Sequence, residues 1–310
     1  MGEAVVHCLT CIVRVYTFQT SGHRERGFGD DERRFVKITK TTAIAASTLL
    51  LVGGLASCSG GGDGGGDGGE GSGLEDSYVV ATDSSFVPFE FEEDGEYVGF
   101  DIDVVNEIAD RVGFEIDLES TNFDGIIPGL QTGAFDIAIA GITITEDRKS
   151  AVDFTSPYYK SGLRIGVPAD NTDITGVDDL EGLTIATRLG STSADYITEN
   201  IDGATPNTYE QLDQAYLSVE GGGSDAVLYD APNVEYYILT EGEDSLKTVG
   251  ELLEAQDYGI ALAKGNEDLL EAMNAALAEM IDDGTYADIY NEWFGSDPEW
   301  IDELAEAQAG

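Results

Sequence analysis

Short apolar segments alternate with segments of helical periodicity over most of this chain, and this alternation restricts its fold more than any other feature. Runs at 78–81, 115–119 and 135–140 predict strands, and the segments between them, 101–111 and 124–131, predict helices. Strands that alternate with helices in this order predict a parallel, doubly wound sheet with helices on its faces.

The same alternation is repeated further along, which predicts a second lobe. Strands are expected at 163–167, 183–186, 226–229 and 258–263, and helices at 177–180, from Ser193, and at 210–219, 231–240, 267–281 and 286–294. The C-terminal segment returns to the first lobe, so the chain crosses between lobes twice, at 158–162 and 254–258. We therefore predict an α/β fold of two doubly wound lobes joined by two hinge strands. Lobe 1 is assigned to 74–160 plus 256–310, and lobe 2 to 161–255.

The segment 133–162 contains a first candidate for a ligand site. Its strand, bounded by Gly133 and Gly141, is followed by Thr145, a typical N-cap with acidic residues in the first helical turn. Arg148 falls on that turn, beyond the carboxyl end of a strand, where open α/β sheets bind ligands. A guanidinium and the free N–H groups of a helix start both suit a carboxylate. The pattern fits an exposed arginine in a surface loop equally well.

The charge of the chain is extreme and unevenly distributed. Its 310 residues have a net charge of −46, and the part after Ser57 holds 8 basic and 56 acidic residues. Such a charge excludes nucleic acid and anionic membrane surfaces as partners. A hydrophobic content of 42% still supplies a core, so this is not an acidic disordered chain. Acid-rich, lysine-poor surfaces indicate a halophilic protein, whose self-repulsion concentrated salt screens.

Residues 1–57 predict an export signal rather than a part of the fold. Residues 1–30 lack steady periodicity, and spurious upstream translation is one explanation for them. Paired Arg33 and Arg34 precede an apolar run at 43–56, which is too short to span a membrane comfortably but suits a signal-peptide core. This order predicts twin-arginine export, with ordinary Sec export as the alternative.

The signal ends at Cys58, in a Leu-Ala-Ser-Cys sequence that resembles a lipobox, and residues 58–73 form a glycine-rich tether. We expect an exported protein held at the outer face of the cytoplasmic membrane by lipid on Cys58. Cys8 and Cys11 form a weak metal or redox motif. No histidine follows His23 and no cysteine follows Cys58, so the folded part lacks the side chains for Ser-His-Asp or Cys-His catalysis and for a transition-metal site.

Several long motifs, in order, resemble one family, the family-3 extracellular solute-binding proteins, which are the polar amino-acid receptors of ABC importers. The motifs are ATDSSFVPFEF (81–91), GFDIDVVNEIA (99–109), FDGIIPGLQTG (123–133), AGITITEDRKSAVDFTSPYYKSGL (140–163), DAVLYDAPN (225–233), EAQDYGIALAKGN (254–266) and DGTYADIYNEWFG (283–295). The resemblance extends over 74–296. It implies a type II periplasmic-binding-protein-like fold, whose two lobes close on one amino acid.

The resemblance also implies what the protein works with. We expect a monomeric receptor that delivers its ligand to the permease subunits of an ABC transporter and needs no cofactor or metal. Within the family the chain is most similar to glutamine receptors, so glutamine is the expected ligand, bound by a lipoprotein of the haloarchaeal type.

By this resemblance, five residues hold the groups that all amino acids share. Arg148 binds the α-carboxylate together with the backbone N–H of Thr192 at a helix start. The α-ammonium is received by the Gly141 carbonyl, the Thr143 hydroxyl and the Asp230 carboxylate.

Five further positions match residues that contact the ligand's side chain. Phe86 and Phe123 enclose its aliphatic part, although aromatics at such spacing are by default core residues. Asp83 accepts hydrogen bonds from it. Arg188 and Tyr229 stand where the glutamine receptors have lysine and histidine, and arginine does not replace lysine freely.

Two other functions stay open at the level of the sequence. A sensory partner of a chemoreceptor would use the same pocket. Some relatives on this scaffold are cyclohexadienyl dehydratase-like enzymes, which need a general acid and base directed at the substrate ring. An acid placed for an ammonium group, as Asp230 is, favours a receptor over such an enzyme.

Overall fold

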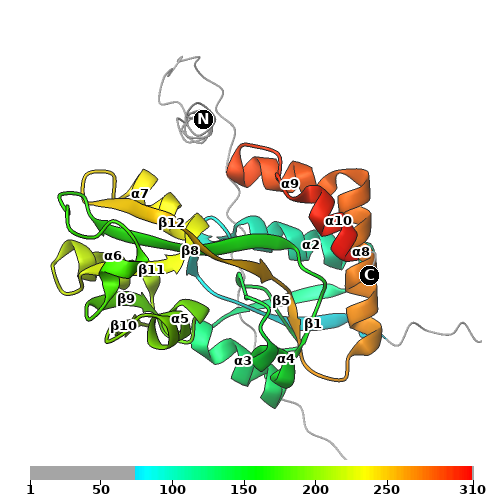
Figure 1. Cartoon of the computed structure of the whole chain (residues 1–310). Coiled ribbons are helices and arrows are strands. Elements are labelled where there is room, and N and C mark those ends of the chain that lie inside the picture. The colour runs from blue at the N-terminus through cyan, green and yellow to red at the C-terminus, as the bar shows by residue number, and fades with distance from the viewer. Residues whose placement is uncertain (1–73, 309–310) are drawn as a thin grey trace, which may run out of the picture. The chain divides into compact units, whose positions relative to one another are not determined.

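The structure is a computed structural model that describes residues 74–308; the expected export signal, Cys58 and the tether lie outside the described residues. Two five-stranded sheets form two lobes (Figure 1). The sheet of the first lobe has the order β5 (Glu115–Ser120), β1 (Ser77–Thr82), β6 (Ile137–Ala138), β13 (Ala261–Leu262) and β7 (Asp153–Phe154). The sheet of the second lobe has the order β10 (Thr205–Tyr209), β9 (Thr184–Arg188), β11 (Ala226–Asp230), β8 (Tyr159–Pro168) and β12 (Leu246–Tyr258).

Each sheet has a parallel part and an antiparallel part. In the first lobe β1 pairs in parallel with β5 and β6, and β13 pairs antiparallel with β6. In the second lobe β9 pairs in parallel with β10 and β11, and β8 pairs antiparallel with β11. The prediction of an α/β fold in two doubly wound lobes is confirmed, and each sheet has antiparallel pairs besides the parallel ones that were expected. Strands next to a crossing enter their sheet from the opposite end, which reverses their direction.

Helices cover the two sheets in separate sets. The first lobe has α2 (Phe100–Val112), α3 (Phe123–Thr132), α4 (Glu146–Ala151), α8 (Glu267–Asp283), α9 (Thr285–Phe294) and α10 (Ile301–Gln308). The second lobe has η1 (Val177–Leu180), α5 (Thr192–Asn200), α6 (Leu212–Glu220) and α7 (Ala231–Thr240). Within the described range, every helix is too short or too polar to cross a membrane.

The two lobes are connected by β8 and β12, which lie side by side along their whole length (Figure 1). Their pairing runs from Tyr159 opposite Tyr258 to Pro168 opposite Leu246, and its register shifts twice between Val249 and Gln256. At this irregularity Glu254 has a φ of 41°, and the backbone of β12 arches over β8. A Cβ on Gly162 would lie 2.8 Å from the Glu254 carbonyl oxygen, so only glycine fits beneath the arch.

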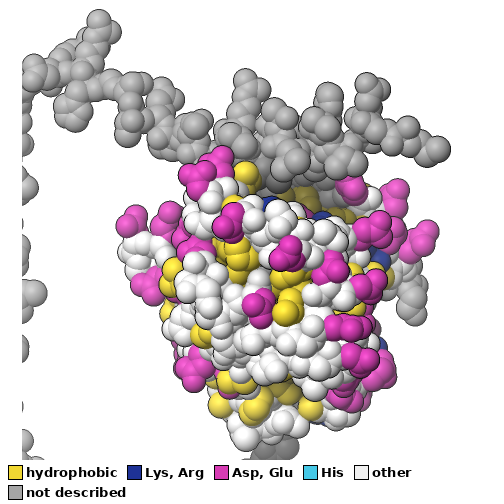
Figure 2. Space-filling model, turned by 60° about the vertical axis from the view of Figure 1, so that its left-hand side comes forward, with side chains coloured by type: hydrophobic (Ala, Val, Ile, Leu, Met, Phe, Trp, Pro, Cys, Tyr) yellow, Lys and Arg dark blue, Asp and Glu magenta, His cyan; other side chains and the backbone are white. Residues whose placement is uncertain are grey.

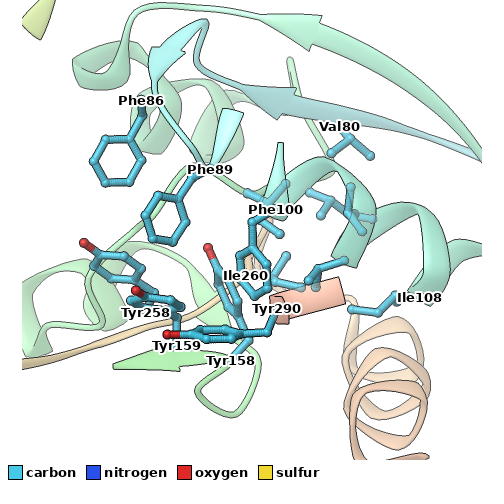
Figure 3. Packing of buried hydrophobic residues seen from close by; sticks show 14 of the residues in the cluster. Val80, Phe86, Phe89, Phe100, Ile108, Tyr158, Tyr159, Tyr258, Ile260 and Tyr290 are labelled. Atoms are coloured by element: carbon cyan, nitrogen blue, oxygen red, sulfur yellow. The ribbon is translucent and has the colours of Figure 1, made fainter. Parts of the chain in front are cut away.

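An aromatic cluster holds both crossing strands in the first lobe (Figure 3). The rings of Tyr159 in β8 and Tyr258 in β12 stack at a centroid distance of 5.5 Å. Phe89 packs edge-on against Tyr159 at 4.8 Å, and Trp300, just before α10, does so at 5.1 Å. Each such pair adds about 0.5–1.5 kcal/mol to the effect of burial. The crossing strands are therefore fixed at this end, and α10 covers them.

Several elements were not predicted from the sequence. They are the small sheet of β2 (Ser85–Phe86), β3 (Glu90–Glu93) and β4 (Glu96–Val98), the strands β7 and β10, most of β12, and α10. β10 has the sequence TPNTY and half of β12 is exposed, so neither shows an apolar pattern. The predicted boundaries of the two lobes, at 160/161 and 255/256, stay predictions, because both fall inside or next to strands that belong to the crossing.

Acidic side chains are scattered over the visible surface, mostly towards its edges, and basic ones occupy only small areas of it (Figure 2). All eight lysines and arginines after Ser57 have a polar partner in the structure. Arg111 at the end of α2, for example, pairs with Glu107 at 2.7 Å and with Asp283 of α8 at 2.8 Å. Few cations are thus free to offset the acidic surface.

Lowering the salt concentration is expected to unfold the protein. With 8 basic and 56 acidic residues after Ser57, repulsion is long-ranged in dilute buffer, whereas about 1 M salt screens it within about 3 Å. Far-UV circular dichroism during dialysis from concentrated to dilute salt measures this. A full helical signal in dilute buffer would contradict the prediction.

Candidate ligand-binding site

The guanidinium of Arg148 lies where the two lobes meet. Thr145 caps α4 as predicted, since its hydroxyl accepts a hydrogen bond from the Arg148 backbone N–H at 3.1 Å. The Arg148 side chain donates to the Thr143 carbonyl at 2.8 Å and, across the cleft, to the Gly190 carbonyl at 3.1 Å. Gly190 stands two residues before α5, so the guanidinium and the N-terminus of α5 face the same space. Both attract a carboxylate.

Asp230 supplies a negative charge to the same cleft. It ends β11, is 4% exposed, and accepts a hydrogen bond from the Tyr258 hydroxyl at 2.5 Å. Burial raises its pKa to about 6, while the Tyr258 hydroxyl and the charge of Arg148 oppose that rise. Burial has the opposite effect on a base, so it lowers the pKa of Arg148. Asp230 is the nearby group that most offsets this effect. The two charges therefore interact without forming an ion pair.

Gln256 of β12 connects the two lobes beside these charges. The Thr143 hydroxyl donates to Gln256 Oε1 at 3.3 Å, and Gln256 Nε2 donates to the Thr192 hydroxyl at 3.2 Å. A groove of about 960 Å³ opens along this row and is lined by Thr143, Arg148, Thr192 and Gln256, among others. Thr192 begins α5, with Ser191 as its N-cap. Arg148 and Thr192, predicted for the carboxylate, and Thr143, predicted for the ammonium group, thus line one groove.

The opposite end of the cleft is closed by an ion pair. Arg188, from the end of β9, contacts Asp83, which follows β1, and both side chains are 1% exposed. Arg188 also donates to the Glu210 carbonyl at 3.2 Å. Its Nε is buried without an acceptor among the described residues. The Tyr229 hydroxyl shares a hydrogen bond with Arg188, and burial raises the pKa of Tyr229.

The two predicted aromatic residues lie on different sides of these charges. Phe86 lies against Gly141, where a Cβ would be 2.4 Å from its ring, and Gly141 has a φ of 53°. The Phe123 ring faces both guanidinium groups, at 5.4 Å from Arg148 and 5.5 Å from Arg188. Distances of this size are typical of cation–π contacts. Both aromatics are therefore buried by their neighbours and also border the cleft.

Of the ten predicted site residues, Thr143, Arg148 and Thr192 line the groove, whereas Asp83, Phe86, Phe123, Arg188 and Tyr229 are buried in contacts between the lobes. Their roles towards a ligand stay predictions. Four contributing residues were not predicted: Glu90, Asp101, Gln256 and Tyr258. Gln256 and Tyr258 fall within a motif shared with the family (254–266), which was the available signal for them. Glu90 and Asp101 also fall within shared motifs, but nothing in their spacing indicated that they would be buried together.

Residues 78–296 match the family described as bacterial extracellular solute-binding proteins, family 3. The L-cystine-binding protein TcyJ of Escherichia coli K12 is 34% identical over 221 residues, which cover 71% of this chain and 83% of TcyJ. The glutamine-binding protein GlnH of Bacillus subtilis 168 is 32% identical over 225 residues, covering 71% and 81%. An ancestral arginine-binding protein, solved with arginine, is 40% identical with a TM-score of 0.69, covering 71% and 99%. An ancestral arginine-binding protein solved with glutamine is also 40% identical with a TM-score of 0.69, covering 72% of this chain and 100% of that one.

The fold and the cleft thus define an amino-acid-binding protein of ABC importers, with the type II periplasmic-binding-protein-like architecture. The chain belongs to the bacterial extracellular solute-binding proteins, family 3. Its relatives are solute-binding proteins of an extracytoplasmic family, and their names include different amino acids.

Amino-acid binding is expected to weaken as the pH falls through about 6. The pKa of Asp230 is raised from its usual value of 3.8 to about 6. Its carboxylate is therefore ionised above about pH 6 and neutral below it. An ammonium group is attracted only by the ionised form. Without ligand, the same raised pKa makes Asp230 stabilise the fold as the pH falls from 6 towards 4, because the folded state then takes up the proton first.

Isothermal titration calorimetry on either side of pH 6 checks this, with Asp230→Asn and the exposed Glu181→Gln as a matched pair. Asp230→Asn should lose at least about 30-fold in affinity at neutral pH, whereas Glu181→Gln should bind as the wild type does. An affinity that stays constant as the wild type is acidified would contradict the role given to Asp230.

Proposed function

We propose that this protein binds glutamine between its two lobes and delivers it to an ABC permease on the outer face of the membrane. The observation that carries the proposal is the charge arrangement in the cleft. Arg148 with the N-terminus of α5 forms a positive seat, and Asp230 with the Thr143 hydroxyl forms a negative one. An amino-acid zwitterion places its carboxylate at the positive site and its ammonium group at the negative one. Each of its charges therefore meets a partner instead of being buried alone.

The partners of the arginines support the carboxylate seat. Among the arginines of residues 74–308, Arg111, Arg164 and Arg188 each pair with an acidic side chain. Arg148 alone has no carboxylate at ion-pair distance within that range, although acids outnumber bases sevenfold after Ser57. A guanidinium kept apart from so many acids is available to a ligand carboxylate.

The choice of glutamine rests on the ion pair at the other end of the cleft. Within residues 74–308, Arg188 Nε is a buried donor without an acceptor, and Asp83 is a buried acceptor beside it. A carboxamide offers an oxygen to the first and an N–H to the second, whereas an unpaired buried donor costs about 1–3 kcal/mol. A cationic side chain meets the Arg188 charge directly. Glutamine therefore suits this end better than arginine or lysine.

The remaining parts of the proposal concern how the receptor is held and how it works. We propose that β8 and β12 act as the hinge of a clamp formed by residues 74–160 plus 256–310 and residues 161–255. We also propose a monomer adapted to concentrated salt and anchored by lipid on Cys58 through the 58–73 tether. The acid excess and the glycine-rich sequence support these points.

A thermal-shift screen of the twenty amino acids in concentrated salt tests the function. A ligand at 100 times its Kd adds about 2.7 kcal/mol to the free energy of unfolding, and glutamine should give the largest shift. If no amino acid raises the melting temperature, the proposed function is wrong. If another polar amino acid gives the largest shift, the choice of glutamine is wrong and the class of ligand remains.

The carboxylate seat is tested in the same screen by two neighbouring variants on α4. Arg148→Ala should weaken glutamine binding at least about 30-fold, because it leaves the carboxylate without its charged partner. Lys149→Ala removes the same charge from an exposed pair with Glu146 and should change affinity less than about threefold. Equal affinities for the two variants would rule out the seat.

Selectivity should reverse in Arg188→Ala. The variant leaves Asp83 as a buried carboxylate without its partner, which destabilises the protein and attracts a cationic side chain. Arginine or lysine should then raise the melting temperature more than glutamine does. The control is Asp83→Asn combined with Arg188→Ala, which has neither charge and should gain no preference for arginine. Continued preference for glutamine in the single variant would contradict the role of the ion pair.

A further inference from the structure

Two acidic side chains, Glu90 of β3 and Asp101 of α2, are buried against each other behind the cleft. Both residues are fully buried, and their carboxyl groups interact, since Asp101 raises the pKa of Glu90 and Glu90 lowers that of Asp101. Neither oxygen of Glu90, nor Oδ1 of Asp101, meets an N–H or hydroxyl donor among the described residues. Two interacting carboxyl groups that are buried in a low-dielectric site are not both ionised, so the pair shares one proton.

The surroundings decide which of the two carries the proton. Burial, with Asp101 and Asp83 nearby, raises the pKa of Glu90 well above its usual value, and Arg188 offsets only part of this. Burial raises the pKa of Asp101 to about 6, opposed by the Gly141 N–H, the Tyr158 hydroxyl and Glu90 itself. On the α9 side, the nearby group is Tyr286, whose pKa the charge of Asp101 raises. At neutral pH Glu90 is therefore the donor and Asp101 the ionised acceptor.

Asp101 uses its other oxygen to hold two functional segments. Its Oδ2 accepts a hydrogen bond from the Gly141 backbone N–H at 2.8 Å and another from the Tyr158 hydroxyl at 2.8 Å. Gly141 is in the left-handed region beneath the Phe86 ring, in the loop expected to receive the ligand's ammonium group. Tyr158 immediately precedes β8, and its carbonyl accepts a hydrogen bond from Tyr286 at 2.5 Å. One carboxylate thus connects the ligand loop to the start of a crossing strand.

We propose that Asp101 and Glu90 are positioning residues, a carboxyl pair with one proton that fixes the Gly141 loop in its ligand-binding conformation and ties it to the crossing strand at Tyr158. The proposal rests on the proposed function only in that Gly141 faces an amino acid. Glu90 keeps Asp101 ionised by donating to it, and the ionised carboxylate is the stronger acceptor for the Gly141 N–H. The pair therefore contributes to affinity without touching the ligand.

Two substitutions of Glu90 separate its hydrogen bond from its volume. Glu90→Gln keeps a donor towards Asp101, whereas Glu90→Met has nearly the same size and no donor. Without the donor the pKa of Asp101 should rise by about one unit or more, which brings it into the neutral range. Glutamine binding by Glu90→Met should then be weak at neutral pH and recover as the pH is raised, while Glu90→Gln should follow the wild type. Asp230 has no contact with Glu90, so its titration is the same in all three proteins.

A second measurement needs no ligand. The backbone amide resonance of Gly141, followed by NMR during a pH titration in concentrated salt, should report the ionisation of Asp101. Its midpoint should lie near 6 in the wild type and in Glu90→Gln, and higher in Glu90→Met. Tyr158→Phe removes the other side-chain donor to Asp101 and should raise the midpoint as well. If Glu90→Met fails to fold, the midpoint in Tyr158→Phe tests whether side-chain donors keep Asp101 ionised.

The outcomes distinguish this proposal from the proposed function. If no amino acid binds the wild type, the proposed function fails, and the Gly141 titration still tests the carboxyl pair. If Glu90→Gln binds as poorly as Glu90→Met, or if the Gly141 midpoint is the same in the wild type, Glu90→Met and Tyr158→Phe, the pair has no positioning role and the proposal is overturned.

Discussion

The ion pair between Asp83 and Arg188 is the interaction on which the arrangement of the cleft depends. Each charge is 1% exposed, and a buried charge without a partner would cost several kcal/mol. Asp83 follows a strand of the first lobe and Arg188 ends a strand of the second, so the pair exists only while the lobes are in contact. In the proposed clamp, closing the cleft and neutralising its far end are therefore one event. At the near end, Arg148 and Asp230 interact but do not pair, which leaves opposite charges facing the same space.

Much of the fold could be predicted from the sequence because its periodic segments bury one face. The apolar spacing in 101–111 predicted α2, and Thr145 followed by acids predicted the start of α4. β12 was largely missed because half of its residues are exposed and its register is irregular, so its position depends on pairing with β8 rather than on its own pattern. Local sequence does not record a partner that lies some 90 residues away.

Some residues of the candidate site could also be predicted from the sequence, and others could not. The sequence pattern offered Arg148 as a candidate, a rare base at a helix start beyond a strand, although it suited an exposed surface arginine equally well. Asp230 follows an apolar strand, and its role came from the family resemblance. Gln256, Glu90 and Asp101 could not be predicted, because polar residues are ordinarily exposed and only the tertiary structure buries these three. The family motifs contained them without indicating a role. Their contribution becomes visible only in the hydrogen bonds, such as that from the Gly141 N–H to Asp101.

The arch in β12 has a consequence for the proposed hinge movement between the lobes. Between Tyr159 and Pro168 the strand β8 takes the shortest path, while β12 uses 13 residues, Leu246–Tyr258, to accompany the 10 of β8. The surplus is concentrated over Gly162, where a side chain would leave it no room. β8 thus spans the crossing without surplus residues, whereas β12 has extra residues in its arch. When two lobes rotate about a pair of connecting strands, the lengths that the two strands must span change unequally. The extra residues of β12 would let the pair bend while the hydrogen bonds at both of its ends stay intact.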